Sequence, residues 1–378
     1  MQLIRRLSII ATVTIAVTAA AAMPAAATAP TLSRVDTGQL IPLASLGGGE
    51  SWAVQMNEIG DIVGGSTDAR QDWRPAVWWH GRRSATALGV DRASPSAISD
   101  KGHIVGRLWD SGALFLWRRG TVTYLRKPTG TDLEVAAVND RDQVVGTAYH
   151  QNGTSRAFLW QRGRFTLFPV PRGASSTAVD INNRGQIAGV VARRDAQQAA
   201  LWQQGRMIEL GTLGGSASTP VAINDRGQVI GNSTIKKSSA EHPFLWQHGR
   251  MTDLLAGTTA RGGRVYDLSD TAMMTGSVDQ GDGHDRPVLW RAGRMIELGV
   301  PGYSGIGMAV NDRGDVAGFS RQRMEGPAVP FRWRNGRTTY FPKPIPDIAS
   351  NLIGINRHGT IAVEQETTSV GFTVLRSA

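Results

Sequence analysis

The feature that most constrains this chain is a unit of about 42 residues that recurs along nearly its whole length. Its clearest copy, from Ile223 to Leu254, reads INDRGQVIGNSTIKKSSAEHPFLWQHGRMTDL. Each copy begins with an Asn turn or its equivalent, and successive turns lie 40 to 45 residues apart. They begin at Asn57, Ser99, Asn139, Asn182, Asn224, Ser269, Asn311 and Asn356. This period predicts an all-β, eight-bladed β-propeller with four antiparallel strands per blade.

The fifth copy shows how one blade is expected to fold. Four short runs of β-branched and aromatic residues alternate with Gly-containing turns, which indicates strands and no helix. The expected strands are 220–223, 228–231, 242–246 and 250–254. In the first turn, Asn224 can hydrogen-bond the backbone two residues on, and Gly227 supplies a positive φ. Ala272 replaces this glycine in the sixth copy, so we expect that blade to turn differently.

A tryptophan near the end of the third strand recurs in seven of the eight copies. The positions are Trp78, Trp117, Trp160, Trp202, Trp246, Trp290 and Trp333. A buried indole removes ~150–250 Å² from water, so this series can hold neighbouring blades together. We expect packing between blades; a ligand-binding series is the alternative.

The eighth copy ends after three strands, and its missing fourth strand is predicted from the other end of the chain. Residues 38–48 (GQLIPLASLGG) mirror residues 205–215 (GRMIELGTLGG), which follow a repeat tryptophan. The N-terminal segment should therefore pair beside 372–375 and complete the last blade, which would remove two exposed sheet edges. Pro42 suits an outermost strand, where one side needs no donor.

Residues 1–27 read as a secretory signal peptide, and residues 28–378 as a single propeller domain. Arg5 and Arg6 precede an apolar stretch that ends at small residues, Ala25 to Ala27. A membrane anchor is the alternative for this segment. No later stretch of the sequence is long and apolar enough to span a bilayer. We expect a secreted monomer without disulfides, because the chain has no cysteine.

The formal net charge of +10 favours attraction to anionic polymers, or reflects a preference for arginine codons. No basic run with interleaved aromatics appears, so a nucleic-acid partner is not expected. The expected partner is a cell-wall or extracellular polysaccharide, or a protein.

Binding is expected on the rim formed by the long loops, since rigid scaffolds commonly present variable loops for recognition. Trp73 and Trp109 lie in such loops of adjacent blades and could stack on sugars; extra packing is the alternative. A set of cations on the same class of loop could hold an anionic ligand, or serve solubility. It comprises Arg193, Arg194, Lys236, Lys237, Arg321 and Arg323.

Calcium is the one cofactor that the sequence suggests. Asp279, Asp282 and Asp285 lie on a glycine-rich loop, and calcium prefers several oxygen ligands on a flexible turn. The spacing does not match an EF-hand, and a solvated turn is the alternative.

No catalytic residue is predicted, because nucleophile-elbow, Walker and dinucleotide glycine motifs are absent and the seven histidines are scattered. The leading hypothesis is a secreted, non-catalytic propeller that binds a cell-surface polymer or partner protein. One alternative is an envelope-polysaccharide hydrolase or lyase that uses acids at the channel mouth. A purely structural extracellular protein is the other.

The units INDRGQVIG, FLWQHGRMTDL and LGTLGGSAS resemble the HAF-repeat family of secreted bacterial proteins, from about Gly38 to the end. The nearest matches to the family's His-Ala-Phe triplet are Arg156-Ala157-Phe158, His242-Pro243-Phe244 and Val329-Pro330-Phe331. The resemblance implies an extracellular repeat protein and no particular activity.

Overall fold

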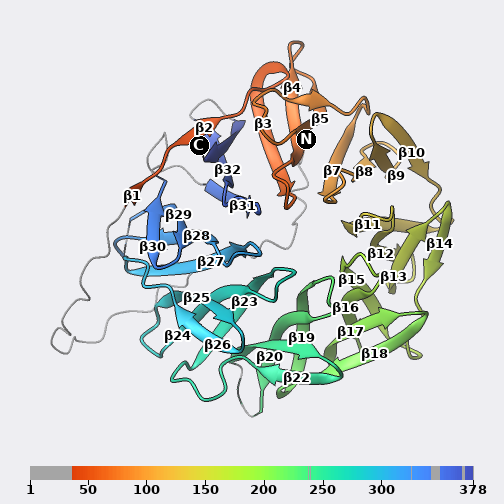
Figure 1. Ribbon diagram of the computed structural model, residues 1–378. Helices are drawn as coiled ribbons and strands as arrows, with labels where there is room; N and C mark the ends of the chain where they lie inside the picture. The colour runs from red at the N-terminus through yellow and green to blue at the C-terminus, as the bar shows by residue number, and fades with distance from the viewer. Residues whose placement is uncertain are drawn as a thin grey trace.

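The computed structural model describes residues 36–236, 238, 240–324, 326–341, 350–367 and 371–377. These residues form strands and connecting loops, and the strands form sheets arranged in a ring (Figure 1). The predicted signal peptide, residues 1–27, lies outside the described residues. Within the described part of the chain, no helix is long and apolar enough to cross a membrane.

Strand pairing divides the described strands into eight four-stranded antiparallel units, which we number as blades in chain order. Blades 1 and 2 contain β3 (Gly47–Met56), β4 (Ile62–Asp68), β5 (Trp73–Trp78), β6 (Thr86–Ala87), β7 (Ala93–Ile98), β8 (Ile104–Leu108), β9 (Leu114–Arg118) and β10 (Thr121–Leu125). Blades 3 and 4 contain β11 (Thr131–Val138), β12 (Val144–His150), β13 (Ser155–Gln161), β14 (Arg164–Leu167), β15 (Ser175–Ile181), β16 (Ile187–Ala192), β17 (Gln197–Gln203) and β18 (Arg206–Gly211).

The other four blades follow the same order. Blades 5 and 6 contain β19 (Gly214–Ile223), β20 (Val229–Ile235), β21 (Glu241–Gln247), β22 (Arg250–Asp253), β23 (Gly262–Leu268), β24 (Met274–Asp279), β25 (Asp285–Arg291) and β26 (Arg294–Glu297). Blades 7 and 8 contain β27 (Ser304–Val310), β28 (Val316–Arg321), β29 (Ala328–Arg334), β30 (Arg337–Tyr340), β31 (Ser350–Ile355), β32 (Ile361–Thr367) and β33 (Gly371–Ser377), with β2 (Leu40–Pro42) as the last strand. Blades 4 and 5 are joined by one parallel pair, Gln197 with Ala217.

The predicted closure of the ring is confirmed. Strand β2 pairs antiparallel with β33, with Leu40 opposite Ser377 and Pro42 opposite Leu375, and β2 forms the edge of blade 8. The structure adds a contact that we did not predict: β1 (Asp36–Thr37) lies parallel to β30 on the edge of blade 7. The N-terminal segment, residues 36–48, therefore crosses from blade 7 over blade 8 to blade 1. We call this segment the clasp.

The core lies between blades. Eight hydrophobic clusters each combine residues of two neighbouring blades, and the repeat tryptophans are buried in them as predicted. Trp202, for example, packs with Leu159 of the preceding blade. Apolar burial at these interfaces holds the ring together.

The sixth blade does not turn differently, contrary to our expectation. The backbone N–H of Ala272 donates to the carbonyl of Ser269 (3.1 Å), as Gly227 does to Asn224 (2.9 Å). Ala272 reaches this turn at φ 65°, in the left-handed region that disfavours residues with a Cβ. The surrounding blade fixes the turn at the cost of local strain.

Candidate functional site: an acid-lined pocket on the axis

The tight turns between the first and second strands of each blade form a connected ring. The buried side-chain amide of Asn57 donates to the carbonyl of Ser99 in the next blade (3.0 Å), and Asn182 donates to Asn224 in the same way (2.9 Å). The same link runs from Asn139, Asn224 and Asn311, while the amide of Asn356 donates to the carbonyl of Ile59 in blade 1 (3.3 Å). Because every amide bonds to both its own turn and the next blade, the rim is held rigidly.

The second position of these turns carries an acid in six of the eight blades. The eight residues are Glu58, Asp100, Asp140, Asn183, Asp225, Asp270, Asp312 and Arg357. Carboxylate oxygens of one blade often accept a backbone N–H of the preceding blade: Asp100 accepts from Glu58 (2.9 Å) and Asp270 from Asp225 (2.8 Å). These bonds fix the acids near the axis.

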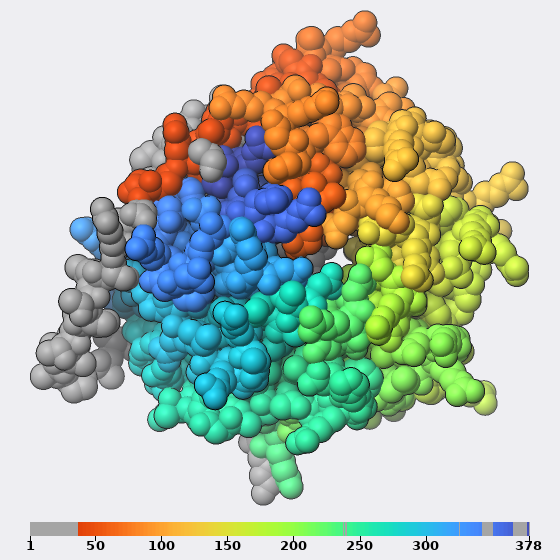
Figure 2. All heavy atoms as spheres, in the orientation of Figure 1, coloured from red at the N-terminus to blue at the C-terminus, as the bar shows by residue number. Residues whose placement is uncertain are grey.

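The acids surround a pocket of about 390 Å³ on the propeller axis. Its walls are the ends of the first strands and their turns, from all eight blades. They include Gln55, Glu58, Asp100, Asp140, Asp225, Asp267 and Asp270. Figure 2 shows a hollow near the centre of the ring. The pocket therefore lies on the tight-turn rim, opposite the long-loop rim where we expected binding.

Burial changes the protonation of the pocket acids. Desolvation, followed by the negative charges of Asp267 and Asp100, raises the pKa of Glu58 to about 8. One oxygen of Glu58, Oε2, is buried without a hydrogen-bond partner. Burial also raises the pKa of Asp267 to about 6, although Asp267 accepts backbone N–H groups of Val310 and Leu268.

This arrangement suits a positively charged organic group. Crowded carboxyl groups with raised pKa values are stabilised by a cation, and the unpartnered Glu58 Oε2 can accept a hydrogen bond from it. Among the described residues no group of three or more His, Asp or Glu side chains could hold a metal ion. An ammonium group supplies three donors that these carboxyl groups can accept.

The two predicted stacking tryptophans lie outside this pocket. Trp73 begins β5 and is partly buried. Trp109 is 50% exposed, and its indole N–H donates to the hydroxyl of Ser94 (2.7 Å). Its ring lines neither the axial pocket nor a second pocket between blades 5 and 6, and its binding role stays a prediction.

The predicted cationic set is spread over three blades. Arg193 forms an ion pair with Glu209, so its charge is already neutralised. Arg194, Lys236 and Arg323 are exposed, Arg321 ends β28, and Lys237 lies outside the described residues. The structure does not gather this set into one site.

The three acids of the predicted calcium loop do not form one group of candidate metal ligands among the described residues. Arg286 forms an ion pair with Asp282, and an Asp279 oxygen accepts the backbone N–H groups of Gly281 (2.7 Å) and Gly283 (3.2 Å). Asp285 belongs to no metal-binding group with these acids. These contacts engage the carboxylates of Asp279 and Asp282, and calcium binding by Asp279, Asp282 and Asp285 stays a prediction.

No family model matches this chain. A search of curated proteins also finds no match. The resemblance to the HAF-repeat family therefore stays a prediction.

Solved structures of propellers do match. The β-propeller domain of the trilobed protease from Pyrococcus furiosus, described as having an open velcro topology, aligns with TM-score 0.54 and 11% identity over 79% of this chain and 100% of that one. An acylaminoacyl peptidase from Pyrococcus horikoshii aligns with TM-score 0.52 and 11% identity over 84% of this chain and 57% of that one. A puromycin-hydrolysing peptidase from Mycobacterium tuberculosis aligns with TM-score 0.51 and 13% identity over 88% of this chain and 61% of that one.

These likenesses confirm the propeller fold and correct the functional prediction. At 11 to 13% identity the similarity itself shows the fold. The matched propellers belong to peptidases, so the interpretation as a non-catalytic module that binds a surface polymer or partner protein is not retained. This chain spans less than two thirds of the two larger peptidases.

Proposed function

We propose that this chain is a peptidase-associated propeller whose axial pocket holds the positively charged amino group of a peptide. Cleavage of the peptide bond is assigned to a separate catalytic domain or chain. The observation that carries the proposal is the acid-lined pocket, with the buried, unpartnered Oε2 of Glu58 among crowded carboxyl groups. The likeness to propellers of peptidases supports a peptide as the ligand.

The size of the pocket fits this role. Its volume of about 390 Å³ is near the lower end of the range for ligand sites, roughly 300–1,000 Å³. It therefore suits the end of a peptide better than a folded partner. The amino terminus is the one cationic group that all unmodified peptides share.

The pKa values of the pocket acids set the pH dependence of binding. The raised pKa values keep Glu58 and Asp267 partly protonated at neutral pH; Asp267 ionises as the pH rises through about 6, and Glu58 as it rises through about 8. A bound ammonium favours the ionised carboxylates, so peptide binding should release protons. Above pH ~8 the peptide amino group itself loses its charge. Affinity should therefore be highest between about pH 7 and 8.

Calorimetry with an unmodified tetrapeptide and its N-acetylated form tests the proposal. Acetylation should weaken binding about tenfold or more, because a charge-assisted hydrogen bond contributes roughly 1.5–3 kcal/mol. Glu58→Gln should weaken binding of the unmodified peptide by a similar factor and leave the acetylated peptide unaffected.

The control is Asp195→Asn, which removes one negative charge from an exposed loop of blade 4. It should bind like the wild type. Equal binding of both peptides, or a Glu58→Gln variant with wild-type affinity and an intact melting transition, would contradict the proposal.

Secretion, a monomeric state and the HAF-repeat resemblance remain proposals that rest on the sequence. They are independent of the pocket. Sizing of the mature protein recovered from culture medium would test the first two together.

A further inference from the structure

Arg332 occupies a position that is aliphatic in the other six tryptophan-containing blades. It directly precedes the repeat tryptophan, and the equivalent residues pack between blades. They are Val77, Leu116, Leu159, Leu201, Leu245 and Leu289. Blade 7 thus places a guanidinium group where its neighbours place a hydrocarbon.

The surroundings of Arg332 compensate its charge only in part. One guanidinium nitrogen, Nη1, donates to the carbonyl of Gly359 in blade 8 (2.8 Å), and the group lies 5.7 Å from the centre of the Phe341 ring. Its Nε is buried without a hydrogen-bond partner. Arg332 is half-buried and forms no ion pair among the described residues, and removing an unpaired charge from water is costly.

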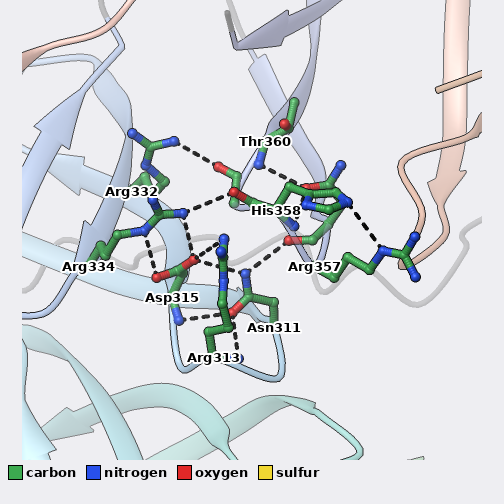
Figure 3. Close-up of polar contacts among 10 residues, drawn as sticks. Asn311, Arg313, Asp315, Arg332, Arg334, Arg357, His358 and Thr360 are labelled. Carbon is green, nitrogen blue, oxygen red and sulfur yellow. Dashed lines mark hydrogen bonds and ion pairs between the residues drawn. The ribbon is translucent and has the colours of Figure 1, made fainter. Parts of the chain in front are cut away.

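Further arginines lie beside it. Figure 3 shows Arg313 and Arg334 at the single carboxylate of Asp315, with Arg332 beside Arg334. Arg334 binds Asp315 with two nitrogens (both 2.8 Å), and Arg313 Nη2 lies 3.1 Å from Asp315 Oδ2. The Asp315 side chain is only 4% exposed, while those of Arg313 and Arg334 are 50% and 39% exposed.

The blade 8 turn adds to the positive charge. Arg357 is exposed, and its Nε donates to Nε2 of His358 (3.2 Å). Arg334 also donates to the carbonyl of His358 (3.0 Å). We call Arg313, Arg332 and Arg334 the arginine cluster; Asp315 is its one acid within ion-pair distance among the described residues. Arg357 points away from this cluster (Figure 3).

The protonation of the cluster agrees with an excess of positive charge. Burial lowers the pKa of Arg332, and the neighbouring Arg334 lowers it further. Burial alone would raise the pKa of Asp315, but its bonds with Arg334 and Asn311 hold that pKa below its ordinary value. Asp315 is therefore ionised, and Arg334, Arg313 and Asn311 already bind it.

We propose that the arginine cluster is a binding site for an oxyanion, either a carboxylate or a phosphate group. Guanidinium groups present paired N–H donors that match the oxygens of both anions. Arg313 and Arg334 supply the accessible donors, and the anion compensates the charge of Arg332 behind them. This site is distinct from the proposed peptide pocket, and neither proposal depends on the other.

Thermal melting and calorimetry with inorganic phosphate and with acetate, each at constant ionic strength, test the site. For the wild type, phosphate or acetate should raise the melting temperature by several degrees relative to chloride. A larger shift with phosphate assigns the site to phosphate groups, and a larger shift with acetate assigns it to carboxylates. No specific shift with either anion would overturn the proposal.

Arg332→Leu restores the aliphatic residue of the other blades. In chloride it should melt at the wild-type temperature or a few degrees higher, because replacing a buried charge by a hydrocarbon is often neutral or stabilising. It should also lose most of the anion-dependent shift. A full shift retained in Arg332→Leu would show that Arg332 is only a structural cation and would overturn the proposal.

Two further variants sharpen the result. Asp315→Asn removes the internal carboxylate and should increase phosphate affinity severalfold, whereas a loss of affinity would contradict the account.

Arg291→Leu is the control. It changes the exposed arginine that follows the repeat tryptophan of blade 6, and it should keep the full anion-dependent shift in melting temperature. Glu58→Gln should also keep that shift, which separates failure of this site from failure of the peptide pocket.

Discussion

Replacing Leu40 and Leu43 together by aspartate should destabilise the protein by more than about 4 kcal/mol and lower its melting temperature by about 10 °C or more. Both side chains are buried, 6% and 4% exposed, on the two sides of blade 8. Leu40 packs with Phe341 and Leu352, and Leu43 packs with Trp78. Charges at these positions would be buried without partners.

The large effect follows from the clasp as a whole. Its backbone bonds blade 7 through Gly38 to Tyr340 (2.8 Å) and blade 1 through Ala44 to Arg83 (2.8 Å). Loss of the clasp would expose the edge of β33 and open the ring at one interface. The control, Gln39→Asp with Ala44→Asp, adds the same charge at exposed positions and should melt within a few degrees of the wild type. Equal melting of the two double variants would refute the closure.

Trp202→Ala should destabilise the protein by about 3–5 kcal/mol. Trp202 is 1% exposed and packs with Ile187 of its own blade and with Leu159 and Phe168 of blade 3. Its ring centre lies 5.6 Å from that of Phe168. The substitution would leave a large cavity at an interface between blades, and denaturant unfolding monitored by circular dichroism would measure the loss.

Trp109→Ala is the matched control for this prediction. Trp109 is 50% exposed, so its loss should change stability by less than about 1 kcal/mol. If both variants lose the same stability, the repeat tryptophans do not hold the blades together. A drop below about 1 kcal/mol for Trp202→Ala would lead to the same conclusion.

The repeating parts of the fold could be predicted from the sequence because they follow local rules. The Asn turns, the glycine positions and the resemblance of 38–48 to 205–215 were enough to predict blades and closure. The parallel strand β1 could not be predicted, because two residues carry no periodicity. Nor could the turn at Ala272, since its neighbours impose a backbone that its own side chain disfavours.

Only part of the candidate site could be predicted from the sequence. Acids recur at the second turn position, as in Glu58 and Asp100, but a local pattern does not show that all eight turns converge on one axis. The hydrogen bonds from asparagine side chains to the next blade could not be predicted for the same reason. The sequence shows that Arg332 replaces the leucine of the Phe-Leu-Trp pattern, but only the structure shows that its Nε has no hydrogen-bond partner. Loop variability favoured the long-loop rim, whereas the axial pocket lies on the tight-turn rim, because variability reports tolerance to change and not the presence of a pocket.

A crystal structure of the protein soaked with an unmodified tetrapeptide tests the central claim most directly. The account predicts the peptide amino group on the axis, within hydrogen-bond distance of the Glu58 carboxylate, with the rest of the peptide leaving through the tight-turn rim. A peptide bound on the long-loop rim, for example against Trp109, or an empty axial pocket at saturating peptide would contradict it.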